Sequence, residues 1–195
     1  MGDSQKKKEL RKKKQNNSSF TGFRLLWLQK RPVIFFVLGF LLLMVVFYIF
    51  WLSSLCQNHI QTKIISINVR LSSFILNLFG MRTIGTRETI SSPSFSVSIA
   101  RGCDAVEAMA LFTSALLVFP ARWNYKLAGF FAGIVILFIL NIGRVISLFL
   151  TGIYFPGIFE FMHVEVWQVL FILCAIGLWI FWIKWTRKKE SHAAQ

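Results

Sequence analysis

The stretch that decides the fold is LAGFFAGIVILFILNIGRVISLFL, residues 127–150. It holds one charged side chain, Arg144, and it exceeds the about 20 apolar residues that a helix needs to cross the roughly 30 Å hydrocarbon core of a bilayer. Outward from it, residues 33–52 and 164–183 are apolar windows of similar kind, and residues 103–119 are a shorter one. We therefore expect four membrane-spanning helices.

The composition of the whole chain is typical of a bilayer protein. Of its 195 residues, 55% are apolar and 16% are aromatic, whereas a soluble domain has about 45–50% apolar residues. A net charge of +14 would suit a nucleic-acid partner, but the basic residues flank the apolar windows instead of lining a folded face. We expect these charges to meet membrane lipid and no nucleic acid.

The distribution of charge predicts the orientation. Lys and Arg are concentrated in residues 1–31, in the loop that holds Arg122 and Lys126, and near the C-terminus. Basic residues next to a span stay in the cytoplasm, so both termini are expected there. The predicted organisation is a basic cytoplasmic arm (1–31), a transmembrane catalytic domain (32–185) and a cytoplasmic tail (186–195).

The long connection between the first two windows is expected to have structure of its own. Residues 59–79 repeat apolar side chains at steps of three and four, which predicts an amphipathic helix in the outer membrane interface. Its apolar stripe consists of Ile60, Ile64, Ile67, Leu71, Phe74 and Leu78. Within residues 82–101, Phe95, Val97 and Ile99 alternate with serines after a Ser-Ser-Pro turn, which predicts a small extracytoplasmic β-hairpin over this range. The expected fold class is all-α membrane, a four-helix transmembrane bundle with this helix and hairpin.

An ionisable side chain inside a predicted span is costly and is therefore a functional candidate. Arg144 is the clearest case, and Asn141 precedes it by three residues on the same helix face. The alternative is that Arg144 extends to outer headgroups or pairs with Glu107 or Glu160. Outer headgroups do not explain why Asn141, which also needs a partner in hydrocarbon, lies beside it.

Two more reactive side chains are expected at the outer face. Cys103 opens the second window, where the partial positive charge of a helix N-terminus favours a thiolate. His163 lies just before the fourth window. A thiol, a guanidinium and an imidazole at one depth suit acyl transfer through a thioester, with His163 as general acid and base and Arg144 stabilising the oxyanion. The alternatives are a packing role for the cysteine and an ordinary interfacial role for the histidine.

Three segments around these residues resemble, in order and topology, the signature blocks of the exosortase/archaeosortase family, in its short exosortase H-like type. They are ARGCDAVEAMALFTSALLVFPA (100–121), NIGRVISL (141–148) and MHVEVWQVLFI (162–172). The resemblance implies a cysteine protease or transpeptidase that uses no cofactor or metal.

The same resemblance implies that Cys103, Arg144 and His163 are the catalytic residues. The implied partners are exported proteins with a C-terminal sorting signal, made of a short motif, a transmembrane helix and a basic cluster. The enzyme would cut between motif and helix and pass the acyl group to an acceptor. It would lie in the bacterial inner (plasma) membrane, with its active site facing the periplasm or exterior.

Four neighbouring polar residues are candidates for supporting or substrate-binding roles. Asn141 is expected to orient Arg144, and Asp104 or Glu107 to orient Arg144 or His163. Capping of the following helix is an equal alternative for Asp104. Arg101 is expected to meet a lipid phosphate or the substrate.

Three other functions stay open at this stage. A thiol-disulfide oxidoreductase would use Cys56 and Cys103 at the outer face, where disulfides persist, although the chain lacks a C-x-x-C pair. A metal-dependent protease would use His163 with nearby glutamates, but no H-E-x-x-H motif supports it. A membrane scaffold or small transporter predicts that Cys103→Ala has no effect.

Overall fold

A computed structural model describes residues 31–100 and 102–193, without the side chain of residue 193. Arg101, residues 194–195 of the expected tail and nearly all of the expected basic arm lie outside the described residues. The chain falls into two units, Met1–Leu41 and Leu42–Gln195. The first helix, Arg31–Trp51, contributes residues to both units.

Three described helical runs are long and apolar enough to cross a membrane. They are Arg31–Trp51, α4 (Trp123–Tyr154) and the run Pro156–His192. The last run consists of a 3₁₀ turn η2 (Pro156–Ile158), a short α5 (Phe159–Phe161), a π-helical turn η3 (Met162–Val166) and α6 (Trp167–Ala193). The membrane class and the three longest windows of the sequence analysis therefore have counterparts in the structure.

The remaining window forms a shorter helix than expected, α3 (Val106–Val118). Its 13 residues extend for about 20 Å, less than the roughly 30 Å of a bilayer core. The backbone explains both ends: Gly102 and Ala105 have φ of +88° and +61°, which stops the helix from starting earlier. At the other end Phe119 is extended, as expected of a residue before proline.

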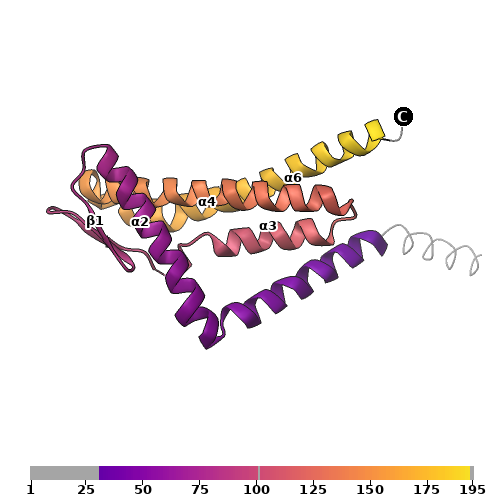
Figure 1. Cartoon of the computed structure of the whole chain (residues 1–195), viewed down its shortest axis with the longest axis horizontal. Coiled ribbons are helices and arrows are strands. Elements are labelled where there is room, and N and C mark those ends of the chain that lie inside the picture. The colour runs from indigo at the N-terminus through magenta and orange to yellow at the C-terminus, as the bar shows by residue number, and fades with distance from the viewer. Residues whose placement is uncertain (1–30, 101, 194–195) are drawn as a thin grey trace, which may run out of the picture. The chain divides into compact units, whose positions relative to one another are not determined.

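Close helix packing joins α3, α4 and α6, which lie side by side in Figure 1. Their shared core consists of Phe112, Leu116, Leu137, Ala175 and Trp182. Gly133 of α4 is required here, because a Cβ at this position would overlap the ring of Phe112. α3 is thus held tightly against the long helices despite its length.

The expected interfacial helix is present as η1 (Cys56–Gln61), a π-helical turn, followed by α2 (Thr62–Leu78). The predicted apolar stripe faces away from the protein, with Phe74 60% and Leu78 69% exposed. A different face contacts the bundle, and it mixes apolar side chains with the fully buried Asn68 and Ser72. α2 therefore has three faces where the sequence pattern predicted two.

A small antiparallel sheet replaces the predicted hairpin. It has three strands in the order β1-β2-β3: β1 (Ile84–Thr86), β2 (Thr89–Ser91) and β3 (Ser96–Ser98). The additional strand arises because the chain also reverses between β1 and β2, where Arg87 has a left-handed φ of +48°.

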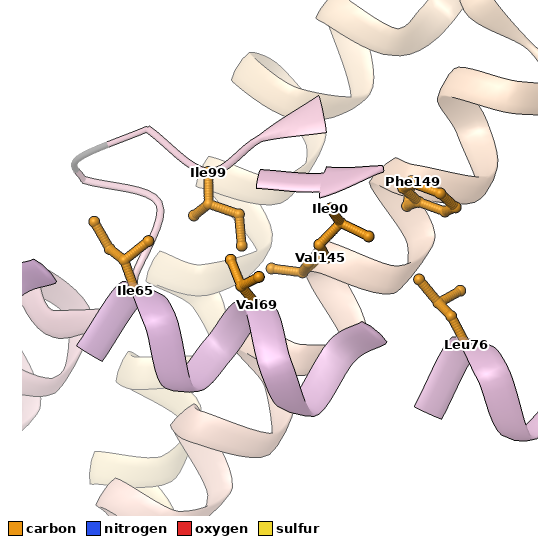
Figure 2. Packing of buried hydrophobic residues seen from close by; sticks show 7 residues of the cluster. All are labelled: Ile65, Val69, Leu76, Ile90, Ile99, Val145 and Phe149. Carbon is orange, nitrogen blue, oxygen red and sulfur yellow. The ribbon is translucent and has the colours of Figure 1, made fainter. Parts of the chain in front are cut away.

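The sheet, α2 and α4 share a second core (Figure 2). Its buried members are Ile65, Val69, Leu76, Ile90, Ile99, Val145 and Phe149. Cys103 and Phe95 pack against the edge of this core. The core therefore places the residues that follow β3 beside the C-terminal third of α4.

Candidate active site

Cys103 lies on the short connection between β3 and α3. The turn is built by Gly102, whose φ of +88° is accessible to glycine at little cost, and by a hydrogen bond from the Cys103 N–H to the Ala100 carbonyl of 3.1 Å. The expectation that Cys103 opens a helix is wrong, because α3 begins only at Val106. The helix N-terminus therefore does not supply the positive charge that the sequence analysis assigned to it.

Burial instead raises the pKa of the Cys103 thiol above its ordinary value. The Arg144 guanidinium lowers this pKa by less, and the carboxylates of Asp104 and Glu107 raise it further. The resting group at neutral pH is thus the thiol, which needs a base before it can attack a carbonyl.

Such a base lies within hydrogen-bonding distance. The Sγ atom of Cys103 is 3.1 Å from Nε2 of His163, which η3 provides. Nη2 of Arg144, from α4, donates to the same Sγ at 3.6 Å and to the backbone carbonyl of His163 at 3.4 Å. One nitrogen of the guanidinium thus links the thiol to the backbone that carries the imidazole.

Aromatic rings hold the guanidinium and the imidazole in place. Arg144 is 8% exposed as a whole residue. Its Cζ lies 5.6 Å from the centre of the Phe171 ring, a cation–π arrangement. Phe159 stacks on the His163 ring, with centroids 5.9 Å apart, and also contacts Phe95 at 6.3 Å. Both groups therefore sit in largely apolar surroundings, where electrostatic interactions are stronger than in water.

Asn141 does not contact Arg144 in the way expected. Its side-chain N–H donates to Oδ1 of Asn68 in α2 at 3.1 Å, and Asn68 donates to the Ile64 carbonyl. Both asparagines are fully buried. Nε of Arg144 has no hydrogen-bond partner among the described residues. The asparagine pair therefore joins α2 to α4 one helical turn before Arg144.

Asn68 is a residue that the sequence analysis missed. It lay between the apolar stripe and the polar face of the predicted helix, so periodicity alone did not single it out. Its only signal was a second small polar residue, Ser72, four positions later, which places both on one face.

Asp104 has a capping contact and a buried position. Its Oδ1 accepts the Val106 N–H at 3.2 Å, and the residue is 1% exposed. Burial raises the pKa of this carboxyl above its ordinary value, while the Val106 amide, the Gln61 side chain and Arg144 lower it by less. Glu107 is exposed beside Cys103. Arg101 lies outside the described residues.

Two cavities meet at the three reactive side chains. One, of about 110 Å³, is lined by residues 97–100 of the sheet region and by Phe159. The other, of about 420 Å³, opens between α3 and α6. Cys103, Arg144 and His163 line both cavities. The thiol therefore borders both cavities.

The described residues contain no cluster of three or more His, Cys, Asp or Glu side chains that could hold a metal ion. The three cysteines are free, and Cys56 is fully buried in η1. The chemistry that this arrangement supports is nucleophilic attack by Sγ, with His163 taking the proton and Arg144 facing the developing negative charge.

Comparison with known proteins gives one result. A family model described as transmembrane exosortase (Exosortase_EpsH) matches residues 17–180. The matched segment includes Cys103, Arg144 and His163. No curated protein and no solved structure matches the chain.

Proposed function

Because this chain belongs to the transmembrane exosortase family, a family of cysteine transpeptidases linked to the processing of sorting signals, we propose that it cleaves C-terminal sorting signals of exported proteins through a thioester on Cys103. The observation that carries the proposal is the position of Sγ, 3.1 Å from His163 Nε2 and 3.6 Å from Arg144 Nη2. A nucleophile, a base and an oxyanion donor thus lie within contact distance of one another.

The first half of the reaction forms the thioester. His163 Nε2 accepts the thiol proton while Sγ bonds to the scissile carbonyl carbon, and Arg144 stabilises the negative charge that develops on the carbonyl oxygen. The tetrahedral intermediate collapses, the C–N bond breaks, and His163 returns the proton to the leaving amine. The amine departs with the transmembrane helix of the signal, and the exported protein remains bonded to Sγ.

The second half releases the exported protein. Water or an acceptor nucleophile loses its proton to His163 and bonds to the thioester carbonyl carbon. Sγ then leaves and regains a proton from His163, which restores the resting pair. The base takes the thiol proton in the first half and the proton of the water or acceptor in the second, so its loss is expected to slow each half by about 10²–10⁴-fold.

We also propose the topology that this chemistry requires. Both termini lie in the cytoplasm of a bacterium, and the Cys103 end of the bundle faces the periplasm or exterior, where exported proteins arrive. α3 acts as the fourth crossing, packed against α4 and α6, and Cys103 lies outside the membrane-spanning segment at its outer end. Lipid contacts the exposed apolar side chains of the long helices.

The test is co-expression with exported reporters that end in a short motif, an apolar helix and a basic cluster, drawn from the C-terminal tails of the source genome. We expect Cys103→Ala, Arg144→Ala and His163→Ala to abolish tail release. A hydroxylamine-sensitive reporter adduct is expected on Cys103 of the parent enzyme and absent from Cys103→Ala. Processing that continues in Cys103→Ala would end the proposal.

Two cysteine variants separate this proposal from the oxidoreductase alternative. Cys174→Ala, in the first third of α6, is the matched control and should process the reporter normally. Cys56→Ala should also retain processing, because the thioester route uses one sulfur. An inactive but folded Cys56→Ala enzyme would instead favour a function that needs two cysteines.

A further inference from the structure

Resting on the proposed function, we infer that the free edge of β3 binds the sorting motif. The peptide segment on the N-terminal side of the scissile bond lies extended along Ser96–Ser98 and adds to the sheet as a further strand. This binding mode uses main-chain hydrogen bonds for affinity and a small cavity for side-chain selection.

The pairing pattern leaves hydrogen-bonding groups of β3 unused. β3 is an edge strand, because the sheet order is β1-β2-β3. The Ile99 N–H donates to the Glu88 carbonyl at 2.7 Å, so Ile99 and, two residues earlier, Val97 face β2 with their backbone groups. Antiparallel ladders alternate, and the N–H and C=O groups of Ser96 and Ser98 therefore point to the free edge. No other described strand pairs with that edge.

The other edge of the sheet is not associated with the reactive side chains. β1 packs against α2, where a Cβ at Gly85 would come within 2.9 Å of Val69 Cγ1 and 3.2 Å of the Val69 carbonyl oxygen. None of the residues of β1 lines either of the two cavities described at Cys103. The β3 edge is thus the one that can present a peptide to the thiol.

The β3 edge opens onto the reactive side chains. The smaller cavity is lined by four consecutive residues, 97–100, together with Cys103, Arg144 and His163. Successive side chains point to opposite faces of a strand, so Val97 and Ser98, the last two residues of β3, can both line a cavity only along the strand edge. A peptide paired with Ser98 would therefore have its following residues beside Cys103 in this cavity.

The cavity also indicates which peptide fits. Its volume is about 110 Å³, and it is the smaller of the two cavities that Cys103 lines. Val145, Leu148 and Phe159 make its wall largely apolar. We expect a small, uncharged residue next to the scissile bond, with the following helix leaving through the larger cavity between α3 and α6.

The first test replaces the outward N–H of Ser98. Ser98→Pro removes this donor without touching the ladder to β2, because proline is tolerated at a sheet edge. We expect KM for the processed reporter peptide to rise about 5-fold or more, the effect of one lost backbone hydrogen bond, with kcat changed much less. Ser94→Pro, in the exposed turn before β3, is the matched control and should keep the parent KM.

The second test modifies the peptide and does not depend on the folding of a variant. Synthetic peptides covering the motif of the processed reporter are N-methylated at one residue at a time. Strand pairing predicts that binding is lost at every second position and kept at the positions between. Uniform loss, or no loss, would overturn the inference.

The results for Ser98→Pro and Cys103→Ala distinguish binding at the β3 edge from the peptidase activity itself. Cys103-dependent processing with a parent-like KM in Ser98→Pro refutes edge binding and leaves the peptidase intact. Processing that persists in Cys103→Ala refutes the peptidase itself. A raised KM in Ser98→Pro, with Cys103 still alkylated by iodoacetamide at the parent rate, supports binding at the edge.

Discussion

Replacing Arg144 with lysine tests whether the guanidinium is needed for its shape or only for its charge. Nη2 donates both to Sγ, at 3.6 Å, and to the His163 carbonyl, at 3.4 Å. A lysine side chain places its ammonium one bond closer to the backbone than Nη2, so it is expected to keep one of these contacts and lose the other. Arg144→Lys therefore removes one geometric constraint while the charge is retained.

The expected decrease in cleavage rate follows from the lost hydrogen bond. A hydrogen bond that involves a charged group contributes about 1.5–3 kcal/mol. With about 1.4 kcal/mol for each tenfold change in rate, Arg144→Lys should slow reporter cleavage by about 10- to 150-fold. Arg144→Ala loses the charge as well and should exceed about 1,000-fold, beyond the loss of a single oxyanion donor.

The assay is the initial rate of tail release by the purified enzyme at saturating and at low reporter concentration. Thermal unfolding of the same samples checks that the fold is kept. Arg70→Lys, on the exposed polar face of α2, is the matched control and should behave as the parent, since surface substitutions usually change stability by less than about 0.5 kcal/mol. A cleavage rate for Arg144→Lys within about twofold of the parent would refute the need for both hydrogen bonds of Nη2.

Three further predictions concern stability and ionisation. Asn141→Ala leaves Asn68 without its partner and should destabilise the protein by about 1–3 kcal/mol. In a double-mutant cycle with Asn68→Ala, the coupling should be about 0.6–1.7 kcal/mol, and additive effects would contradict the bond. Asp104→Asn should raise the unfolding temperature at pH 7. Because the pKa of the Asp104 carboxyl is raised in the folded protein, the stability of the parent falls as the pH rises from 3.8 through that pKa. The stability gained by Asp104→Asn should therefore vanish at lower pH. A gain that does not change with pH would contradict the raised pKa. The iodoacetamide reaction of Cys103 should still be accelerating at pH 9.0, because burial raises the thiol pKa above that ordinary value, and a plateau near neutral pH would exclude this account.

The features that could be predicted from the sequence are those for which the residue pattern has a single physical explanation. An uninterrupted apolar run can only be a buried or spanning helix, and α4 extends the predicted window by one turn at each end. Arg144 stood out because a charge in such a run needs a partner. The candidate thiol and imidazole followed from their place at the ends of apolar windows.

The remaining features depend on backbone angles and tertiary partners that periodicity does not encode. The positive φ of Ala105, an unusual angle for a residue with a Cβ, shortened α3 and left Cys103 outside it. The buried face of α2 escaped notice because Asn68 is polar and yet faces the bundle, where Asn141 satisfies it. The third strand depended on a left-handed Arg87, a residue type that rarely signals a turn.

Under the proposed function, the outward stripe of α2 would make cleavage depend on the length of the substrate. Phe74 and Leu78 face away from the protein, so the proposed topology places the hydrocarbon boundary along this helix. The Asn68–Asn141 bond joins the same helix to α4 one turn from Arg144, which would hold the reacting atoms at a constant depth relative to that boundary. A tail whose spacer between motif and helix is too long or too short would then present its carbonyl at the wrong depth. The proposed peptidase would therefore select exported proteins by spacer length as well as by motif.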